Sequence, residues 1–331
     1  MAEQLLEFEK VTKIFRRAGL GLVKEKTIKA LDEVSLTLPE EPQIVALVGE
    51  SGSGKTTMAR IILGLEEPTS GQILYKGIDV AHWLKKDRKR YKQEVQIIFQ
   101  DPYGTYNPFY RVDRVFWSVI KKFKLASTDD EAHHLIEDSL EAVGLRHQEL
   151  LGRYPHQLSG GERQRFMLAR IYMLRPNLIV ADEPVSMLDA SLRAMFLNHL
   201  KEFKKLGMSC LYVTHDLNIA YFIADRIVIL CTGQVVEQGA TESIIRKPLH
   251  PYTQDLISSI PTPDPNKRWE EQLVAEKIGL HKLREAGTEG GCIFYNRCSH
   301  VMDKCQHNTP PLEKTNAQEV ACFLYPPADG K

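Results

Sequence analysis

A glycine-rich loop between an apolar run and an amphipathic stretch is the feature that most constrains the fold of this 331-residue chain. The loop follows an apolar run at residues 44–48, precedes an amphipathic stretch at 57–65, and matches G-x-x-x-x-G-K-S/T at every fixed position with Gly49, Glu50, Ser51, Gly52, Ser53, Gly54, Lys55 and Thr56. Strand, glycine loop and helix in this order are typical of the phosphate-binding unit of an α/β protein. A flexible glycine turn is the alternative interpretation, but it requires an accidental match together with the right flanks.

The residue types of this loop suit a nucleotide. Glycines let successive backbone N–H groups curl around phosphates, and the N-terminus of the following helix adds the positive end of its dipole. We expect Lys55 to contact the β- and γ-phosphates, Thr56 to offer its hydroxyl to Mg²⁺, and Thr57 to lie near the α-phosphate. The sequence therefore predicts a nucleotide site at residues 49–57.

Composition narrows the class and the compartment. Lys plus Arg equals Asp plus Glu at 43 each, so no charge excess indicates nucleic acid or an anionic membrane surface. The first seven residues carry acid where a signal peptide needs a basic region, and no run approaches the roughly 18 apolar residues of a membrane helix. We expect a soluble, cytoplasmic chain that reaches a membrane only by docking on other subunits.

Apolar, strand-like runs alternate with helical patterns along the chain. Near-continuous apolar runs favour strands buried on both faces of a mainly parallel sheet, and they occur at residues 43–49, 94–100, 178–182, 210–214 and 226–230. The segments 5–15 and 28–38 predict a smaller antiparallel sheet. The pattern is helical from 101 to about 175, most clearly at 112–123 and 131–143. This indicates a helical subdomain inserted into an α/β core.

A proline-rich break divides the chain near residue 261. Pro261, Pro263 and Pro265 stand at alternate positions and interrupt any helix. We therefore expect one domain at residues 1–260 and a C-terminal extension at 261–331.

A second apolar run ends in two carboxylates. Residues 178–181 read Leu-Ile-Val-Ala and lead into Asp182 and Glu183, the Walker B form. At the end of a strand, Asp182 is suited to hold Mg²⁺ through water, and Glu183 is suited to polarise the attacking water as a general base. Two solvated acids that cap a strand are the alternative, which the spacing after a phosphate-binding loop disfavours.

With these motifs in place, residues 5 to about 260 resemble the ATP-binding subunits of ABC transporters. The resemblance rests on residues that follow the family's order, namely the Q-loop residue Gln100, the signature Leu158, Ser159, Gly160, Gly161 and Glu162, the D-loop residue Asp189, and the H-loop residue His215. It implies a P-loop NTPase core of ABC type with an antiparallel β subdomain and a helical signature subdomain. It also implies a head-to-tail dimer in which each ATP lies between one subunit's phosphate-binding loop and the other subunit's signature.

The resemblance also assigns roles to single residues. Gln100 joins Mg²⁺ and the attacking water to the helical subdomain, and His215 contacts the γ-phosphate and orients the water. Asp189 crosses the dimer interface. Phe15 matches the aromatic residue that stacks on adenine, with an ordinary core aromatic residue as the alternative.

Two segments are similar to one group within that family, the oligopeptide and dipeptide importer ATPases. Residues 100–108 resemble their extended Q-loop, and residues 247–253, Lys-Pro-Leu-His-Pro-Tyr-Thr, resemble the His-Pro-Tyr segment that opens their C-terminal extension. The resemblance implies an ATPase that powers import of dipeptides or oligopeptides, although some members carry oligosaccharides.

The partners that this resemblance implies form a membrane complex. They are a related ATPase in a heterodimer, or a second copy of this chain, together with two membrane-spanning permease subunits. The ATPases lie at the cytoplasmic face of the membrane, and an extracytoplasmic solute-binding protein delivers the cargo.

The C-terminal extension holds four of the six cysteines, Cys292, Cys298, Cys305 and Cys322. A reducing cytoplasm disfavours disulfides, so a four-thiolate metal site is the better interpretation. Zinc sites use tighter pairs of ligands, whereas Cys₄ iron–sulfur clusters occur with varied spacing. Importers with a similar tail are associated with a [4Fe–4S] cluster, and we expect one of structural role here, with Zn²⁺ as the alternative. The other two cysteines lie in apolar runs, which predicts buried thiols.

Two rival functions differ from transport. A soluble ABC ATPase acting on nucleic acid or ribosomes is disfavoured because residues 57–157 show no sustained heptads, only one nucleotide domain is present, and the net charge is zero. A redox sensor whose cluster controls the ATPase would leave the His-Pro-Tyr segment unexplained.

Overall fold

The computed structural model describes residues 4–17, 26–100, 106–260, 290–315 and 318–325. The chain divides into two compact units, each of which is described by itself. The first unit consists of Met1–Glu40, Val45–Val80 and Val213–Lys331, and the second consists of Glu41–Ile44 and Ala81–Tyr212. The predicted break at residue 261 and the predicted Q-loop segment 101–105 lie outside the described residues, so the boundaries 1–260, 261–331 and 101–175 stay predictions.

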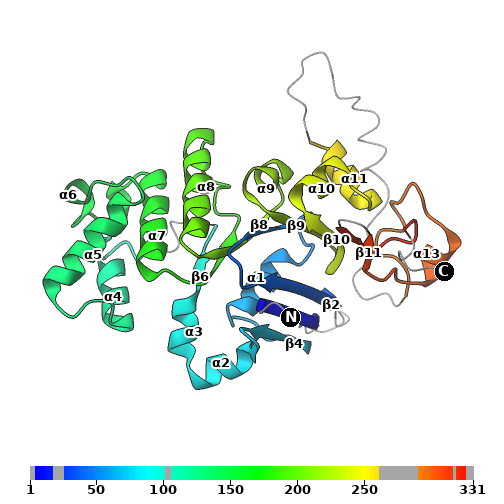
Figure 1. The fold of residues 1–331 in the computed structure, drawn as a ribbon, viewed down its shortest axis with the longest axis horizontal. Helices are drawn as coiled ribbons and strands as arrows, with labels where there is room; N and C mark the ends of the chain where they lie inside the picture. Colours follow the sequence, from blue (N-terminus) through cyan, green and yellow to red (C-terminus); the bar gives the residue numbers. More distant parts are fainter. Residues whose placement is uncertain (1–3, 18–25, 101–105, 261–289, 316–317, 326–331) are drawn as a thin grey trace, which may run out of the picture. The chain divides into compact units, whose positions relative to one another are not determined.

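An antiparallel sheet forms the N-terminal part of the first unit (Figure 1, blue). Its strands have the order β2-β1-β4-β5 and are β1 (Gln4–Arg17), β2 (Lys26–Pro39), β4 (Ser70–Tyr75) and β5 (Ile78–Asp79). Phe8 of β1 lies opposite Leu36 of β2 and Ile73 of β4, and all three side chains are buried. Since side chains alternate along a strand, Glu7 and Glu9 point to the other face. The predicted antiparallel sheet is confirmed.

A second sheet in the first unit joins the segment before the glycine loop to the end of the chain. Its strand order is β11-β12-β10-β9-β3, and the strands are β3 (Ile44–Val48), β9 (Arg226–Cys231), β10 (Gln234–Ala240), β11 (Glu313–Thr315) and β12 (Gln318–Val320). β3 is parallel to β9, and the other neighbours are antiparallel. β9 turns into β10 at Thr232 and Gly233, whose φ values of 42° and 83° suit a tight hairpin turn.

The helices in the described part of the first unit are short. They are α1 (Lys55–Ile62), α9 (Leu217–Ile223), α10 (Thr241–Arg246), α11 (Pro251–Ser258) and α13 (Asp303–His307). Ala46, Val48 and Ile229 of the sheet share one buried cluster with Tyr252 of α11 and with Phe294. The C-terminal segment therefore completes the hydrophobic core of the first unit.

The second unit combines strands with most of the longer helices. Its strands are β6 (Val95–Ile98), β7 (Leu178–Asp182) and β8 (Ser209–Thr214), which runs on into the first unit; the order is β8-β7-β6, and β6 is parallel to β7. The helical elements are α2 (Val80–Lys86), α3 (Arg88–Glu94), α4 (Arg114–Phe123), α5 (Asp129–Glu141), α6 (His147–Leu150), the 3₁₀ helix η1 (Pro155–Gln157), α7 (Gly160–Leu174) and α8 (Ala190–Lys205).

The five apolar runs are all strands, and the helices expected at 112–123 and 131–143 are α4 and α5. Helices α4 to α7 are drawn in blue-green to green in Figure 1, whereas the cyan helices are α2 and α3. Every residue of β8 is buried, as continuous apolar strands require. Among the residues that the structure describes, no helix combines the length and the apolar character needed to cross a membrane.

Candidate nucleotide-binding site

The glycine loop links the buried strand β3 to α1 and has room only for glycine at two positions. A Cβ atom on Gly49 would lie 2.1 Å from the backbone oxygen of Leu230, and one on Gly54 would lie 2.5 Å from that of Ala30. Gly54 also has a φ of 107°, which side-chain-bearing residues rarely adopt. The loop is therefore fixed between β2 and β9 by close backbone contacts.

Lys55, the first residue of α1, is folded into this loop. Its Nζ donates hydrogen bonds to the carbonyl oxygens of Gly49 at 2.7 Å and Glu50 at 2.8 Å, and lies 3.3 Å from Ser53 Oγ. Only 6% of the residue is exposed. A buried ammonium group inside a loop at a helix N-terminus gives the positive potential and the N–H donors that bind a phosphate chain.

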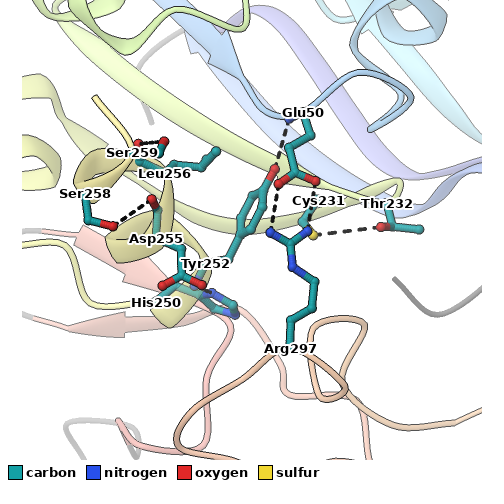
Figure 2. A network of polar contacts seen from close by, with 10 residues as sticks. All are labelled: Glu50, Cys231, Thr232, His250, Tyr252, Asp255, Leu256, Ser258, Ser259 and Arg297. Atoms are coloured by element: carbon teal, nitrogen blue, oxygen red, sulfur yellow. Dashed lines mark hydrogen bonds and ion pairs between the residues drawn. The ribbon is translucent and has the colours of Figure 1, made fainter. Parts of the chain in front are cut away.

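Two residues of the C-terminal part of the chain hold Glu50 from outside the loop (Figure 2). Tyr252 accepts a hydrogen bond from the backbone N–H of Glu50 at 3.0 Å. Arg297 donates two hydrogen bonds to the Glu50 carboxylate, Nη1 to Oε2 and Nη2 to Oε1, each at 3.0 Å. Sequence reasoning missed both contacts, since nothing in the pattern of the chain joins residues more than 200 positions apart.

Two further predicted residues come together in the second unit. Gln100 follows β6 and its Nε2 lies 3.5 Å from Oε2 of Glu183, the residue directly after β7. Asp182 ends β7 and is half-buried. Glu183 has a φ of 45°, a conformation that is uncommon outside glycine and often marks functional sites. Adjacent parallel strands β6 and β7 thus deliver an amide and a carboxylate to one place.

The signature residues form the start of α7. Ser159 caps this helix: its Oγ accepts from the N–H of Glu162 at 3.3 Å, while Glu162 Oε2 accepts from the N–H and the hydroxyl of Ser159, both at 2.7 Å. Burial opposes ionisation, but these hydrogen bonds prevail and lower the pKa of Glu162. Gly160 and Gly161 are the first two helical residues, and Leu158, just before the cap, is buried.

Asp189 caps the next helix in the same way. Its Oδ1 accepts from the N–H groups of Leu192 and Ser191, both at 3.0 Å, and from the Ser191 hydroxyl at 2.7 Å, and these contacts lower its pKa. A Cβ atom on Gly161 would lie 2.7 Å from Leu192 Cδ1. The starts of α7 and α8, which carry the predicted signature and D-loop residues, are therefore in close contact.

The remaining predicted nucleotide ligands lie in the first unit. His215 is exposed directly after β8, and the following residue, Asp216, caps α9 by accepting from Asn218 N at 2.8 Å. Phe15 is half-buried on β1 with the Lys13 ammonium 4.9 Å from its ring centre. Thr56 is exposed and Thr57 is half-buried in the first turn of α1.

The four C-terminal cysteines line one small cavity of the first unit. Burial, followed by the neighbouring thiols, raises the pKa of Cys292 to about 11, and burial also raises the pKa of Cys298 and Cys322. Their donor chemistry suits a soft metal, but in the described part of the chain no group of three or more His, Cys, Asp or Glu residues is arranged to hold a metal ion. The described residues therefore do not support the predicted [4Fe–4S] or zinc site.

The other two cysteines fit their prediction. Cys210 in β8 and Cys231 in β9 are buried, and burial raises the pKa of both, that of Cys231 to about 12. They are inert parts of the core.

Comparison with known proteins agrees with this geometry. Two family descriptions match the chain: "ABC transporter" over residues 31–186, and "Oligopeptide/dipeptide transporter, C-terminal region" over residues 236–305, which include the His-Pro-Tyr segment. A solved dimeric ATP-binding cassette, described as a post-hydrolysis state bound to ADP and Pi, is 30% identical with a TM-score of 0.61 and covers 71% of this chain and 98% of its own.

Relatives match over nearly the whole length. The putative oligopeptide transport ATP-binding protein YkfD of Bacillus subtilis (strain 168) is 37% identical, over 93% of each chain. The dipeptide transport ATP-binding protein DppF of Haemophilus influenzae is 38% identical, over 91% of this chain and 90% of its own. On this likeness and on its phosphate-binding loop, the chain belongs to the family of ABC transporter ATP-binding subunits of the oligopeptide and dipeptide importers.

Proposed function

We propose that this chain binds and hydrolyses ATP to power the import of dipeptides or oligopeptides. The observation that carries the proposal is the glycine loop with the Lys55 ammonium held against its own carbonyl oxygens. In this arrangement the cation and the N-terminus of α1 are ready to exchange loop carbonyls for phosphate oxygens. The cargo rests on the printed names of the relatives and on the matching C-terminal region.

In this proposal the loop residues Gly49 to Thr57 hold the triphosphate, and Phe15 stacks on the adenine. The residues available to hold Mg²⁺ are Thr56, Asp182 and Gln100, whose oxygen donors match the preference of this hard cation. When bound, Mg²⁺ would neutralise developing charge on the β- and γ-phosphates.

Hydrolysis is assigned to Glu183 as general base, with Gln100 and His215 as the residues that orient the attacking water. The contact between Gln100 and Glu183 supports this assignment, since a carboxylate oriented by an amide is poised to accept a proton. Glu183 has a positive φ, a strained backbone conformation that is often found at functional sites, and this is consistent with a catalytic role.

The signature residues Leu158 to Glu162 are proposed to bind the ATP of a partner ATPase. The Ser159 cap supports this role, because it defines the N-terminus of α7, and the N-terminus of a helix favours an anion. Asp189 would cross the same interface. Binding of two ATP molecules would then close the pair, and hydrolysis would reopen it.

The partner is a related ATPase or a second copy of this chain. The pair would act on two membrane-spanning permease subunits at the cytoplasmic face, with an extracytoplasmic solute-binding protein that selects the cargo. Purification of the membrane complex through a tag on this subunit, followed by a screen of peptides and oligosaccharides for stimulation of ATP hydrolysis, tests this assignment. Stimulation by oligosaccharides alone would refute peptides as the cargo.

A [4Fe–4S] cluster remains a separate prediction for the four C-terminal cysteines. Their only structural support is that they line a common cavity, against which stands the absence of a metal-holding group among the described residues. Anaerobically purified chain with a cluster would contain about four irons. Stoichiometric zinc without iron would favour the zinc alternative. A purified chain that contains neither iron nor zinc would refute the predicted metal site.

The catalytic assignment is tested by Glu183→Gln. Gln keeps the shape but cannot accept the proton, so we expect ATP binding to persist while turnover falls by about 10²-fold or more. Glu202→Gln is the matched control, since Glu202 lies on α8 and pairs only with Lys205 at the exposed surface in the contacts described. Hydrolysis by Glu183→Gln at the parental rate would show that Glu183 is not the base.

A further inference from the structure

Glu50 is the residue of the phosphate-binding loop that is most fully engaged by the rest of the first unit. Its N–H donates to Tyr252 Oη, its carbonyl accepts from Lys55, and its carboxylate accepts both hydrogen bonds from Arg297. Figure 2 shows Tyr252 and Arg297 converging on Glu50 from α11 and from the C-terminal segment. One loop residue is thus attached at its backbone and its side chain to residues that the glycine-loop motif does not contain.

The ion pair between Arg297 and Glu50 is partly shielded from water. The Arg297 and Glu50 side chains are 16% and 35% exposed, so water screens them only in part. The Arg297 guanidinium also lies 5.3 Å from the centre of the Phe294 ring, which orients it. A bidentate contact of this kind fixes geometry as well as charge. Without Arg297, the Glu50 carboxylate would be left unneutralised on the same residue whose backbone carbonyl binds the Lys55 ammonium.

Tyr252 is held just as firmly from behind. The Tyr252 N–H donates to His250 Nδ1 at 3.0 Å, and Glu237 accepts from the N–H groups of Leu249 at 2.7 Å and His250 at 3.0 Å. The Tyr252 ring is fully buried, with its centre 5.4 Å from that of Phe294. The His-Pro-Tyr segment therefore holds the Tyr252 hydroxyl group in position to contact the phosphate-binding loop.

We propose that Arg297 and Tyr252 are positioning residues of the phosphate-binding loop. Through these two residues the C-terminal region raises the affinity of the loop for nucleotide, and the increase is larger for a nucleotide that carries more negative charge. Arg297 neutralises the Glu50 carboxylate and keeps it from pairing with Lys55, so the ammonium group stays available to the phosphates. Tyr252 fixes the N–H of Glu50 and hence the direction of the carbonyl that Lys55 must release. This inference rests on the proposed binding of ATP at the loop.

The test is equilibrium binding of MgATP and MgADP to the full-length chain by titration calorimetry. Arg297→Met should weaken MgATP binding about tenfold, equivalent to about 1.4 kcal/mol, and MgADP binding by a smaller factor, because ADP carries less charge. Glu50→Gln added to Arg297→Met should restore most of the affinity, since the unpaired carboxylate is then gone. Misfolding would produce neither the dependence on ligand charge nor the rescue.

Arg246→Met is the matched control. Arg246 pairs with Glu242 on the surface of α10, and the loss of this exposed pair should leave both affinities unchanged. Where Arg297→Met does not fold, Arg297→Lys provides the test: it keeps the charge, loses the bidentate contact, and should weaken MgATP binding less than tenfold.

The outcomes separate the two levels of the argument. A wild-type chain that binds no MgATP would refute the proposed function itself. A wild-type chain that binds MgATP, with Arg297 variants of equal affinity or with equal losses for MgATP and MgADP and no rescue by Glu50→Gln, would refute only the positioning role.

Discussion

The histidine of the His-Pro-Tyr segment should make the first unit sensitive to acid. His250 is 1% exposed, and its Nδ1 accepts the N–H of Tyr252, so the ring is neutral and serves as the cap of α11. Burial lowers its pKa to about 3. In the unfolded chain the same ring titrates near pH 6.5. Between these two values, the unfolded chain takes up a proton that the folded chain does not.

The magnitude follows from the size of this gap. Each pH unit between the two pKa values is equivalent to about 1.4 kcal/mol, and stability is lost as the pH falls, because the unfolded state binds more protons. Lowering the pH from 7 to 5 crosses about 1.5 units of the window and should lower the free energy of unfolding of the first unit by about 2 kcal/mol. The nearby Glu237, whose pKa is raised by burial, contributes with the opposite sign, since its stabilisation is lost as the pH rises.

The variant His250→Asn isolates the contribution of the imidazole. An asparagine side chain can still accept the N–H of Tyr252 as a helix cap, but it does not titrate. Urea unfolding at pH 7 and pH 5, followed by circular dichroism, should show the loss of about 2 kcal/mol in the wild type and its disappearance from the variant. The contribution of Glu237 is present in both chains and cancels in the difference. Equal pH dependence in the two chains, or an NMR titration of His250 near pH 6.5, would refute the reasoning.

Two further predictions concern the loops of the site. Gly49→Ala should destabilise the first unit by on the order of 3 kcal/mol and abolish ATP binding, because the added Cβ would meet the Leu230 oxygen at 2.1 Å. Gly77→Ala, where a Cβ would meet nothing within 4 Å but φ is +70°, should cost only about 1 kcal/mol; thermal unfolding compares the two, and equal losses would contradict the steric account. Ser159→Ala should remove about 1 kcal/mol of capping energy from α7 and should weaken ATP-driven dimerisation, measured by sedimentation, much more than ATP binding to the single chain. Equal losses of dimerisation and of binding would contradict a role of Ser159 toward the partner's nucleotide.

Local sequence patterns predicted much of the fold and of the site. The glycine loop follows directly after the apolar run of β3, and Asp182 and Glu183 stand at the end of the apolar run of β7. Each motif is therefore local in the sequence, and the chain itself fixes the order of its parts. The cap of α7 is equally local, because Ser159 and Glu162 stand three residues apart in the pattern of a capping box. The sequence itself contains this capping-box pattern, but Glu162 was interpreted only as a signature residue, and its role in the cap was missed.

What the sequence did not reveal depends on contacts between distant segments. Strand β12 has three residues, two of them polar, and becomes a strand because its neighbours β10 and β11 offer it hydrogen bonds. The pairing of Arg297 with Glu50 requires the whole first unit to be folded, and no periodicity encodes it. The cysteines show the limit of spacing alone: the spacing suggested four metal ligands, whereas no group of three or more His, Cys, Asp or Glu residues in the described part of the chain is arranged to hold a metal ion.

The pairing of β12 with β10 also has a consequence for biosynthesis. A ribosome completes residues 81–212, the bulk of the second unit, before it reaches the strands that finish the first unit. Until Gln318–Val320 emerges, the nascent chain keeps one edge of β10 open, and open strand edges recruit other chains. This edge therefore cannot close before Gln318–Val320 has been synthesised. If a protease removed Gln318–Val320 from the mature protein, this edge of β10 would be exposed again and could pair with other chains.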